Sequence, residues 1–501
     1  MIDDDNGKSE MKMRVARTLK WNVIDKFSTQ LLYGVTGVIL ARVLSEADFG
    51  LVGAILVFQA FATMFIDGGF SYALIQRKEP TDRDYSTIMW FNVGMSVALY
   101  LVLFLCAPLI ADCFQNDQRL IPLSRVMFLS FIINAFSAVQ QSRLLKRMEA
   151  KQVAVSNSMG LFVAAVVGIS LALTGFGPWA LVWQTISLAV VKTGMLWWLS
   201  SWRPTLYFSW HILKGFTRVG SGMFASSFLN VVFQNIYSFF IGNRVGLVSL
   251  GYYTQADKWS KMGIASLAQV LTSSFLPALS TYQDDPERFA ATTSKMNRFT
   301  SYLVFPAIAM LIVMATPIFH ALFGQKWDPA IFLFQLLLFR GIFTVLGMLY
   351  NNYVISLGRA RLVLVAEFVR DGTALAAIFI TLPYIAIVRP DDVTWGVAIF
   401  LWGQVAASIL AWVYMLIVAS RISWHKPFDF LVDSAPYAAL SLVAAAAMWL
   451  AGMFFTNAWM QLAVEGIVGL TVYMGLSALA GSVVQKDVLA YFLGNFRKKG
   501  Q

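Results

Sequence analysis

Residues 86–111, STIMWFNVGMSVALYLVLFLCAPLIA, decide the fold because this stretch is long, mostly apolar and free of charged side chains. A helix needs about 20 mostly apolar residues to cross a hydrocarbon core that is ~30 Å thick. The apolar side chains run continuously here and do not alternate with polar ones, as they would in a strand of a membrane barrel. The stretch therefore predicts a membrane-spanning helix.

The composition of the whole chain agrees with this prediction. The chain has 501 residues, of which 58% are hydrophobic and 13% are charged. A typical soluble domain carries roughly 25% charged and about 45–50% apolar residues. These proportions exclude a soluble enzyme, a disordered chain and a nucleic-acid-binding protein as first interpretations. The two cysteines, Cys106 and Cys113, have neither the spacing of metal ligands nor that of a disulfide framework.

Fourteen runs of this kind follow one another along the chain and are joined by short connections. Helices satisfy their backbone hydrogen bonds internally, as lipid requires, so we predict an all-α integral membrane protein with fourteen transmembrane helices. The predicted spans are 20–43, 49–75, 86–111, 121–141, 152–174, 177–199, 217–241, 250–279, 299–320, 330–356, 361–387, 393–419, 434–455 and 459–481.

Lysine and arginine are distributed unevenly between the two sides of such a fold. When alternate loops are assigned to alternate sides, most loop lysines and arginines fall on the side that holds both termini. Positively charged loops stay in the cytoplasm, so we expect a multi-pass protein of the bacterial cytoplasmic (inner) membrane with both termini cytoplasmic. The net charge of +11 then belongs to these loops and not to a nucleic-acid-binding surface.

The chain also resembles itself over its first twelve predicted spans. A glycine opens an even-numbered span, a proline lies near the end of an odd-numbered span and a pair of amides ends another span, in the same order in both halves. Six spans is an even number, so both halves have the same topology in the membrane. The matched positions are Gly50 with Gly251, Pro108 with Pro317, and Gln140–Gln141 with Asn351–Asn352.

This repeat predicts two parallel six-helix bundles related by a pseudo-two-fold axis along the membrane normal, with the substrate path between them. Two further C-terminal helices and two basic amphipathic end segments lie outside the repeat. The expected segments are 1–19 as a cytoplasmic lead-in, 20–205 and 206–420 as the two bundles, 421–481 as helices 13 and 14, and 482–501 as a cytoplasmic tail.

Arg340 is the best placed of the cations within the predicted spans, about ten residues inside the span 330–356. A charge inside the membrane costs about 2.5–3.5 kcal/mol on insertion scales, so its presence needs a reason. One interpretation is that Arg340 faces the central cavity and binds an anionic substrate. The other is that it pairs with a carboxylate such as Glu367 or Asp371 on the next span.

Lys26 and Lys261 are the other two cations that we consider for substrate binding. Lys26 lies about two turns inside the first span and can alternatively extend its ammonium to the membrane surface. Lys261 follows Asp257 by four residues, which is also the spacing of an ion pair on a helix. Both roles remain open for each lysine.

Four amides lie at repeat-equivalent ends of the fourth and tenth spans. Their side chains are suited either to binding the hydroxyl groups of a sugar or to tying neighbouring helices together. These residues are Gln140, Gln141, Asn351 and Asn352.

Ion coupling or bending is a second possible role for polar and helix-breaking residues within the spans. Asp67 precedes two glycines, which predicts a helix break, with a hinge or cation site as the alternative. Glu367, Arg370 and Asp371 share one side of a helix, so internal pairing is their first interpretation and ion handling the second. Pro306 removes a backbone donor and is a candidate bending point.

The opening part of the chain resembles the polysaccharide exporters of the multidrug/oligosaccharidyl-lipid/polysaccharide flippase superfamily, above all the bacterial O-antigen and exopolysaccharide flippases. The plan of six, six and two spans resembles that of this branch. The likeness is greatest to exporters of the colanic-acid and teichuronic-acid type. The segments that carry it are Trp21-Asn22, 37–44, Asp48-Phe49-Gly50, 67–70, 73–77 and 107–111.

This resemblance implies a transporter and not an enzyme. The cargo would be an oligosaccharide repeat unit linked to undecaprenyl pyrophosphate, moved from the inner to the outer leaflet by alternating access. The implied partners are this lipid-linked oligosaccharide, membrane lipids and the polysaccharide polymerase or export machinery, with no nucleic acid. Neither a cofactor nor a metal is expected, and the chain has no Gly-rich loop for direct use of ATP.

Three alternatives remain open at this stage. A peptidoglycan-precursor flippase also has fourteen spans and a cationic cavity. A multidrug or cation antiporter shares the architecture but needs an acidic cavity, whereas the deep charges here are mainly basic. A membrane glycosyltransferase or polysaccharide polymerase is similarly hydrophobic, but it presents catalytic loops outside the membrane and does not explain the repeat.

Overall fold

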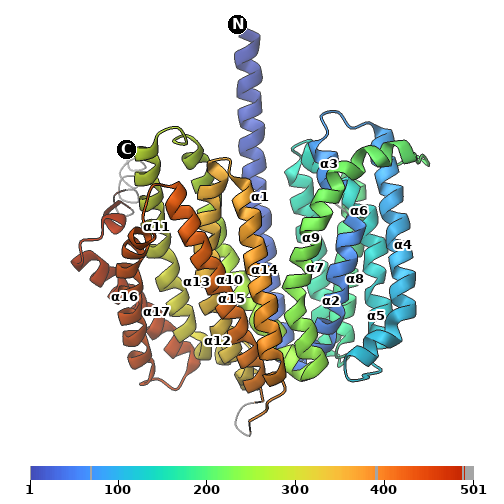
Figure 1. The fold of residues 1–501 in the computed structure, drawn as a ribbon. Helices are drawn as coiled ribbons and strands as arrows, with labels where there is room; N and C mark the ends of the chain where they lie inside the picture. Colours follow the sequence, from blue (N-terminus) through green and yellow to red (C-terminus); the bar gives the residue numbers. More distant parts are fainter. Residues whose placement is uncertain (1, 68–69, 390–392, 488–489, 491–501) are drawn as a thin grey trace, which may run out of the picture. The chain divides into compact units, whose positions relative to one another are not determined.

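The computed structural model describes residues 2–67, 70–389, 393–487 and 490, and these contain helices and no β-strand (Figure 1). The helices are α1 (Ile2–Val43), α2 (Glu46–Asp67), α3 (Phe70–Gln76), α4 (Asp82–Cys113), α5 (Leu120–Met127), α6 (Leu129–Lys146), α7 (Ala150–Leu173), α8 (Trp179–Leu199), α9 (Trp210–Arg244), α10 (Leu247–Ser280), α11 (Pro286–Val313), α12 (Ala315–Leu322), η1 (Gln325–Trp327), α13 (Asp328–Ser356), α14 (Ala360–Thr381), η2 (Leu382–Tyr384), α15 (Trp395–Ile422), α16 (Pro427–Gly452) and α17 (Ala458–Leu479).

Several helices begin where a polar side chain caps the exposed backbone N–H groups of the first turn. Thr81 and Asp84 form a reciprocal capping box that starts α4. The side chains of Ser209, Asp285 and Asn457 accept hydrogen bonds from the first turns of α9, α11 and α17. These caps fix where the long apolar helices begin.

In the described part of the chain, ten helical segments are long and apolar enough to cross a membrane. They are Glu46–Met64, Asp82–Cys113, Leu120–Lys146, Ala150–Leu173, Trp179–Leu199, Pro286–Val313, Gln325–Ser356, Trp395–Ile422, Pro427–Gly452 and Ala458–Leu479. The prediction of an all-helical, multi-pass membrane protein is thereby confirmed.

The other four predicted spans, at 20–43, 217–241, 250–279 and 361–387, also coincide with helices, namely α1, α9, α10 and α14. These four are not among the ten segments found in the described residues. The fourteenfold crossing of the membrane therefore stays a prediction.

The chain forms two compact units, unit 1 (Met1–Gly251) and unit 2 (Tyr252–Gln501). In unit 1, α7 packs against α1 and α8, and α6 packs against α4 and α8. Helix α2 packs against α9, so α9 groups with the first six predicted spans. The boundary between the two units consequently lies within α10, after Gly251. The sequence repeat instead predicts a boundary between residues 205 and 206.

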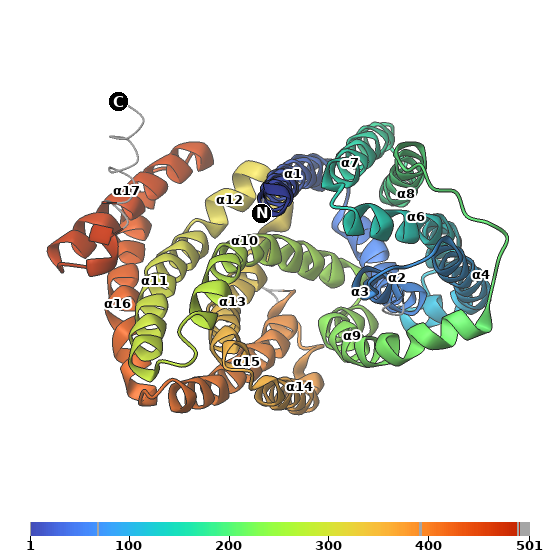
Figure 2. The same ribbon diagram turned by 90° about the horizontal axis from the view of Figure 1, so that it is seen from above.

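In unit 2, α13 packs between α11 and α15, while α14 packs on α15 and α16 on α11 (Figure 2). The pairs α4–α6, α6–α8 and α7–α8 of unit 1 correspond in predicted span order to α11–α13, α13–α15 and α14–α15 of unit 2. The same helix pairings thus occur twice, which supports the internal repeat.

The two glycines matched by the repeat lie against each other's helices within unit 1. A Cβ atom on Gly50 of α2 would lie 1.8 Å from the carbonyl oxygen of Leu247 in α10. A Cβ atom on Gly251 would lie 2.0 Å from the carbonyl oxygen of Glu46. Only glycine permits this approach of two backbones, so both positions serve helix packing.

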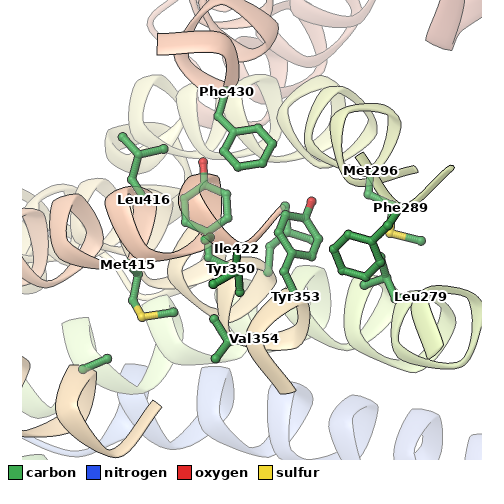
Figure 3. Packing of buried hydrophobic residues seen from close by; sticks show 13 residues of the cluster. Leu279, Phe289, Met296, Tyr350, Tyr353, Val354, Met415, Leu416, Ile422 and Phe430 are labelled. Atoms are coloured by element: carbon green, nitrogen blue, oxygen red, sulfur yellow. The ribbon is translucent and has the colours of Figure 1, made fainter. Parts of the chain in front are cut away.

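A buried aromatic cluster holds α16 to the body of unit 2 (Figure 3). Tyr350 and Tyr353 of α13 are fully buried, and the ring of Tyr350 stacks on that of Phe430 with centroids 5.6 Å apart. Such a pair contributes about 0.5–1.5 kcal/mol beyond the burial of its area. The helices that follow the repeat are therefore anchored by aromatic packing.

Candidate functional site

Arg340 lies near the middle of α13, as the sequence predicts, and is partly buried. Its Nε atom is buried and has no hydrogen-bond partner. Within the described ranges, no ion pair includes its guanidinium. Arg340 is therefore a membrane-level cation whose charge no neighbouring carboxylate of the described chain neutralises.

The carboxylates proposed as alternative partners of Arg340 are engaged within their own helix, α14. The Nη2 atom of Arg370 lies 2.5 Å from Oε2 of Glu367, and its Nε atom lies 3.0 Å from Oδ1 of Asp371. Internal pairing of this triad, predicted from its spacing, is confirmed. The ion-coupling role of Glu367 and Asp371 stays a prediction.

Lys261 forms the ion pair that its spacing predicts, with Nζ 2.6 Å from Oδ2 of Asp257. Lys258, on the same helix, is exposed, and its ammonium lies 5.5 Å from the ring centroid of Trp259. No carboxylate of the described residues pairs with it. The sequence analysis missed Lys258 as a site residue, although two lysines beside one aspartate already indicate that one ammonium is left over.

Helices α10 and α13 of unit 2 touch beside Arg340. A Cβ atom on Gly341 would lie 2.4 Å from Cδ1 of Ile264 and 3.7 Å from Cδ1 of Ile308. Ile264 follows Lys261 by about 4.5 Å along the helix axis. Lys261 and Arg340 thus lie on two helices that contact each other at Ile264 and Gly341. We refer to these two residues and Lys258 as the candidate cationic site of unit 2.

Lys26 belongs to unit 1, on α1, and is exposed without an ion pair in the part of the chain that is described. The preceding residue, Asp25, accepts a hydrogen bond of 3.1 Å from Nδ2 of Asn157 in α7. Successive residues of a helix point about 100° apart, so Lys26 is directed away from the side of α1 that carries Asp25. Lys26 and the cationic site of unit 2 lie in different units.

The four amides differ in what they contact. Gln140 is fully buried, and its Nε2 atom donates a 3.3 Å hydrogen bond to the carbonyl oxygen of Trp202. This bond connects α6 to the linker between α8 and α9. Gln141 is partly buried on the same helix. Asn351 Oδ1 and Asn352 Nδ2 are buried without a hydrogen-bond partner. These two α13 amides keep unused hydrogen-bonding capacity.

The two candidate hinges have different surroundings. The predicted break at Gly68 and Gly69 lies outside the described residues, as does the side chain of Asp67, the last described residue of α2. Pro306 is buried inside α11, which continues to Val313, and the next helix begins at Ala315. A hinge role for either residue stays a prediction.

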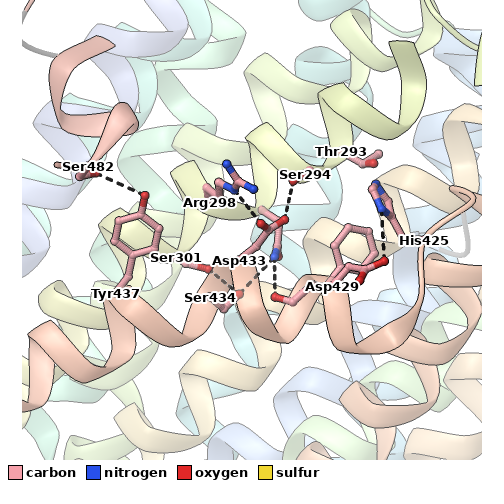
Figure 4. Close-up of polar contacts among 12 residues, drawn as sticks. Thr293, Ser294, Arg298, Ser301, His425, Asp429, Asp433, Ser434, Tyr437 and Ser482 are labelled. Carbon is pink, nitrogen blue, oxygen red and sulfur yellow. Dashed lines mark hydrogen bonds and ion pairs between the residues drawn. The ribbon is translucent and has the colours of Figure 1, made fainter. Parts of the chain in front are cut away.

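A polar network between α11 and α16 was not foreseen from the sequence (Figure 4). Asp433 is buried, and its carboxylate accepts hydrogen bonds from Nε of Arg298 at 2.6 Å and from Oγ of Ser294 at 2.5 Å. Asn297 donates to the Oγ atom of Ser434 at 3.1 Å. The network connects α16 to α11 and does not include Arg340, Lys258 or Lys261.

Comparison with known proteins now identifies the family. The family model described as "Polysaccharide biosynthesis protein" matches residues 39–332. This chain belongs to that family. The succinoglycan biosynthesis transport protein ExoT of Rhizobium meliloti (strain 1021) is 27% identical over 63% of this chain, which spans 64% of that relative's length. The lipopolysaccharide biosynthesis protein WzxC of Escherichia coli (strain K12) is 27% identical over 66% of this chain and 67% of its own.

Two solved structures share the fold. The lipid II flippase MurJ in an inward closed conformation matches with a TM-score of 0.72 and 16% identity, over 95% of this chain and 99% of MurJ. An inward-facing multidrug resistance MATE family transporter matches with a TM-score of 0.59 and 17% identity, over 83% of this chain and 98% of its own. Both likenesses show that this chain shares its fold with these two proteins, which are themselves described as a flippase and a transporter.

Proposed function

We propose that this protein moves a lipid-linked oligosaccharide from the inner to the outer leaflet of the bacterial cytoplasmic membrane, for synthesis of a surface polysaccharide. The unpaired guanidinium of Arg340 in the middle of α13 carries the proposal. A cation held in a membrane without a partner is unfavourable, and an anionic ligand removes that penalty. The relatives named for polysaccharide transport and biosynthesis point to the same cargo class.

The physical problem is set by the two parts of such a cargo. The hydrocarbon tail can remain in lipid throughout the movement. The diphosphate and the sugar hydroxyls cannot cross ~30 Å of hydrocarbon unaided, because neither finds hydrogen-bond partners there. A protein that offers cations and amides at membrane depth replaces the water that these groups lose.

In this proposal Arg340 and Lys258 bind the diphosphate, with Lys261 and Lys26 as further cations. Arginine suits this role because its planar guanidinium makes two parallel hydrogen bonds to phosphate oxygens. Asn351 and Asn352 hydrogen-bond the sugars through their unused amide atoms. Two like-oriented six-helix bundles then alternate in opening towards each side of the membrane.

The finer features of the transporter belong to the same proposal. The chain crosses the membrane fourteen times with both termini in the cytoplasm, which leaves the basic loops on that side. Its cargo carrier is undecaprenyl pyrophosphate, and the flipped unit passes to a polysaccharide polymerase or export machinery on the far side.

The direct test is transport by the reconstituted full chain. Proteoliposomes would contain a fluorescent oligosaccharide linked to undecaprenyl pyrophosphate, and its exposure in the opposite leaflet would be measured. We expect Arg340→Ala to slow movement roughly tenfold or more, since a hydrogen bond to a charged group contributes about 1.5–3 kcal/mol. Arg340→Lys should transport at an intermediate rate, because lysine keeps the positive charge but cannot make the two parallel hydrogen bonds of a guanidinium.

Arg421→Ala is the matched control, because Arg421 is an exposed arginine in the last turn of α15. Transport by Arg340→Ala at the wild-type rate would exclude Arg340 from the mechanism. The same assay with lipid II in place of the oligosaccharide lipid tests the nearest alternative, a peptidoglycan-precursor flippase. Faster movement of lipid II would favour that cargo.

A further inference from the structure

At one end of unit 1, two buried donors lack acceptors. Arg143 of α6 is 9% exposed, yet no hydrogen bond or ion pair of the described residues includes its guanidinium. Trp202, in the linker that follows α8, is 5% exposed, and its Nε1–H is buried without a hydrogen-bond partner. A buried N–H is almost always paired, so the Trp202 donor beside a guanidinium without an ion pair needs an explanation.

The two donors belong to one small, well-defined arrangement. The Cζ atom of Arg143 lies 5.8 Å from the ring centroid of Trp202 and 5.9 Å from that of Tyr85 in α4. The two rings are themselves 5.8 Å apart and meet edge to face. The guanidinium is therefore flanked by two aromatic side chains from two other segments of unit 1.

The linker that carries Trp202 is fixed in position by further hydrogen bonds. Gln140 of α6 donates to the carbonyl oxygen of Trp202, and the backbone N–H of Thr205 donates to Oγ of Ser86 at 3.1 Å. The indole Nε1 atom of Trp90 donates to the carbonyl oxygen of Thr205 at 2.8 Å. The indole N–H of Trp202 therefore belongs to a segment that hydrogen bonds fix in position.

No carboxylate of the described residues forms an ion pair with Arg143. Asp84 accepts from the backbone N–H of Thr81 at 2.8 Å and pairs with Nη1 of Arg77 at 3.3 Å. Asp82 and Glu149 attract Arg143 electrostatically, but neither forms an ion pair with it in the described chain. A ligand that reaches this site meets an unneutralised guanidinium.

We propose that Arg143 and Trp202 form a binding site for the phosphate group of an anionic membrane lipid. A phosphate accepts bidentate hydrogen bonds from a guanidinium, and its remaining oxygens accept one from an indole N–H. The site lies at the ends of two candidate spans, Leu120–Lys146 and Trp179–Leu199, where lipid headgroups are found. Trp198, four residues before Trp202, is 77% exposed, as is typical of a tryptophan at a membrane interface.

The test measures lipid binding and is independent of transport. The full chain in dodecyl maltoside micelles would be titrated with short-chain phosphatidylglycerol, and bound lipid counted by native mass spectrometry. We expect Arg143→Gln to weaken binding about tenfold or more, since a charge-assisted hydrogen bond is lost. Trp202→Phe keeps the ring but removes the N–H, so it should weaken binding severalfold. Arg147→Gln, which removes the exposed neighbouring charge on the same end of α6, should weaken binding less than Arg143→Gln does.

Two further probes distinguish the sources of the phosphate. Diacylglycerol of the same chain length has no phosphate and should not bind at this site. Inorganic phosphate that competes fully with phosphatidylglycerol would overturn the lipid assignment in favour of a free anion. Equal losses in Arg143→Gln and Arg147→Gln would overturn the site itself, because binding would then depend on overall charge. If Arg143→Gln fails to fold, the Trp202→Phe variant still tests the proposal. Unchanged binding of phosphatidylglycerol by Trp202→Phe would be enough to overturn it.

Discussion

At the residue scale, the membrane-level charges of unit 2 fall into two classes. Arg370 and Lys261 are neutralised by carboxylates at helical spacing, so they are accounted for by local structure. Arg340 and Lys258 have no such partner among the described residues. Because an unpaired charge is unfavourable at membrane depth, the second class is where ligand binding is expected.

This division predicts different consequences for the two lysines of α10. We expect Lys258→Gln to slow movement of the oligosaccharide lipid roughly tenfold, because a free ammonium bound to phosphate is lost. Lys261→Gln should have a smaller effect, since Asp257 already neutralises that charge. The measurement is leaflet exposure of the fluorescent cargo in proteoliposomes with matched protein content. A larger loss for Lys261→Gln than for Lys258→Gln would contradict this assignment.

At the element scale, the crossing of α2 and α10 depends on glycine. We predict that Gly251→Ala lowers the thermal unfolding midpoint of the purified protein, because the added Cβ would lie 2.0 Å from the Glu46 carbonyl oxygen. Overpacking of this kind costs about 1–3 kcal/mol. Gly475→Ala in α17 is the control, because nothing lies within 4 Å of its Cβ position. Equal midpoints for the two variants would rule out a close backbone contact at Gly251.

The attachment of α16 gives a second prediction for helix packing. Asp433→Asn should destabilise the protein by about 1–3 kcal/mol, because the part-buried hydrogen bonds from Arg298 and Ser294 lose a charged acceptor. Asp429→Asn is the comparison, since that carboxylate is half-exposed and lies one turn earlier on α16. Unfolding midpoints of both variants in the same detergent would be measured. A destabilisation by Asp429→Asn as large as that by Asp433→Asn would contradict a specific role of the network.

The helices themselves were largely predictable because each depends on a local pattern. Each of the fourteen apolar runs overlaps one or two helices of the described chain. The pairing of Glu367 with Arg370 was predictable for the same reason, since the two residues lie one turn apart.

Contacts between distant segments were not predictable from the sequence. Arg298 and Asp433 are 135 residues apart, and no local pattern connects them. The orphaned donors of Arg143 and Trp202 come from a helix and a linker whose proximity depends on the whole of unit 1. Lys258 was missed because Asp257 can pair with either of two lysines on α10. Only the side-chain geometry shows that it pairs with Lys261.

At the scale of the whole molecule, the proposed transport moves charge across the membrane. A diphosphate that carries two negative charges gains about 4.6 kcal/mol per 100 mV when it moves outward through the full inside-negative field. The binding cations stay with the protein, so they do not cancel this gain. We therefore predict that an inside-negative potassium diffusion potential, set with valinomycin, increases outward movement roughly tenfold at 100 mV.

The control for this prediction is the same proteoliposome with valinomycin and equal potassium on both sides, where no potential forms. An unchanged rate under the imposed potential would mean that each cargo is accompanied by cations that balance its charge. Asp67, Glu367 and Asp371 are the carboxylates through which such coupling is expected to act, and Glu367 and Asp371 already share one guanidinium on α14. Coupling would require the ion pair between Glu367 and Arg370 to open so that the carboxylate can bind a cation. In a coupled transporter, Glu367→Gln would therefore restore the dependence of the transport rate on membrane potential. In an uncoupled flippase, the same substitution would leave this dependence unaltered.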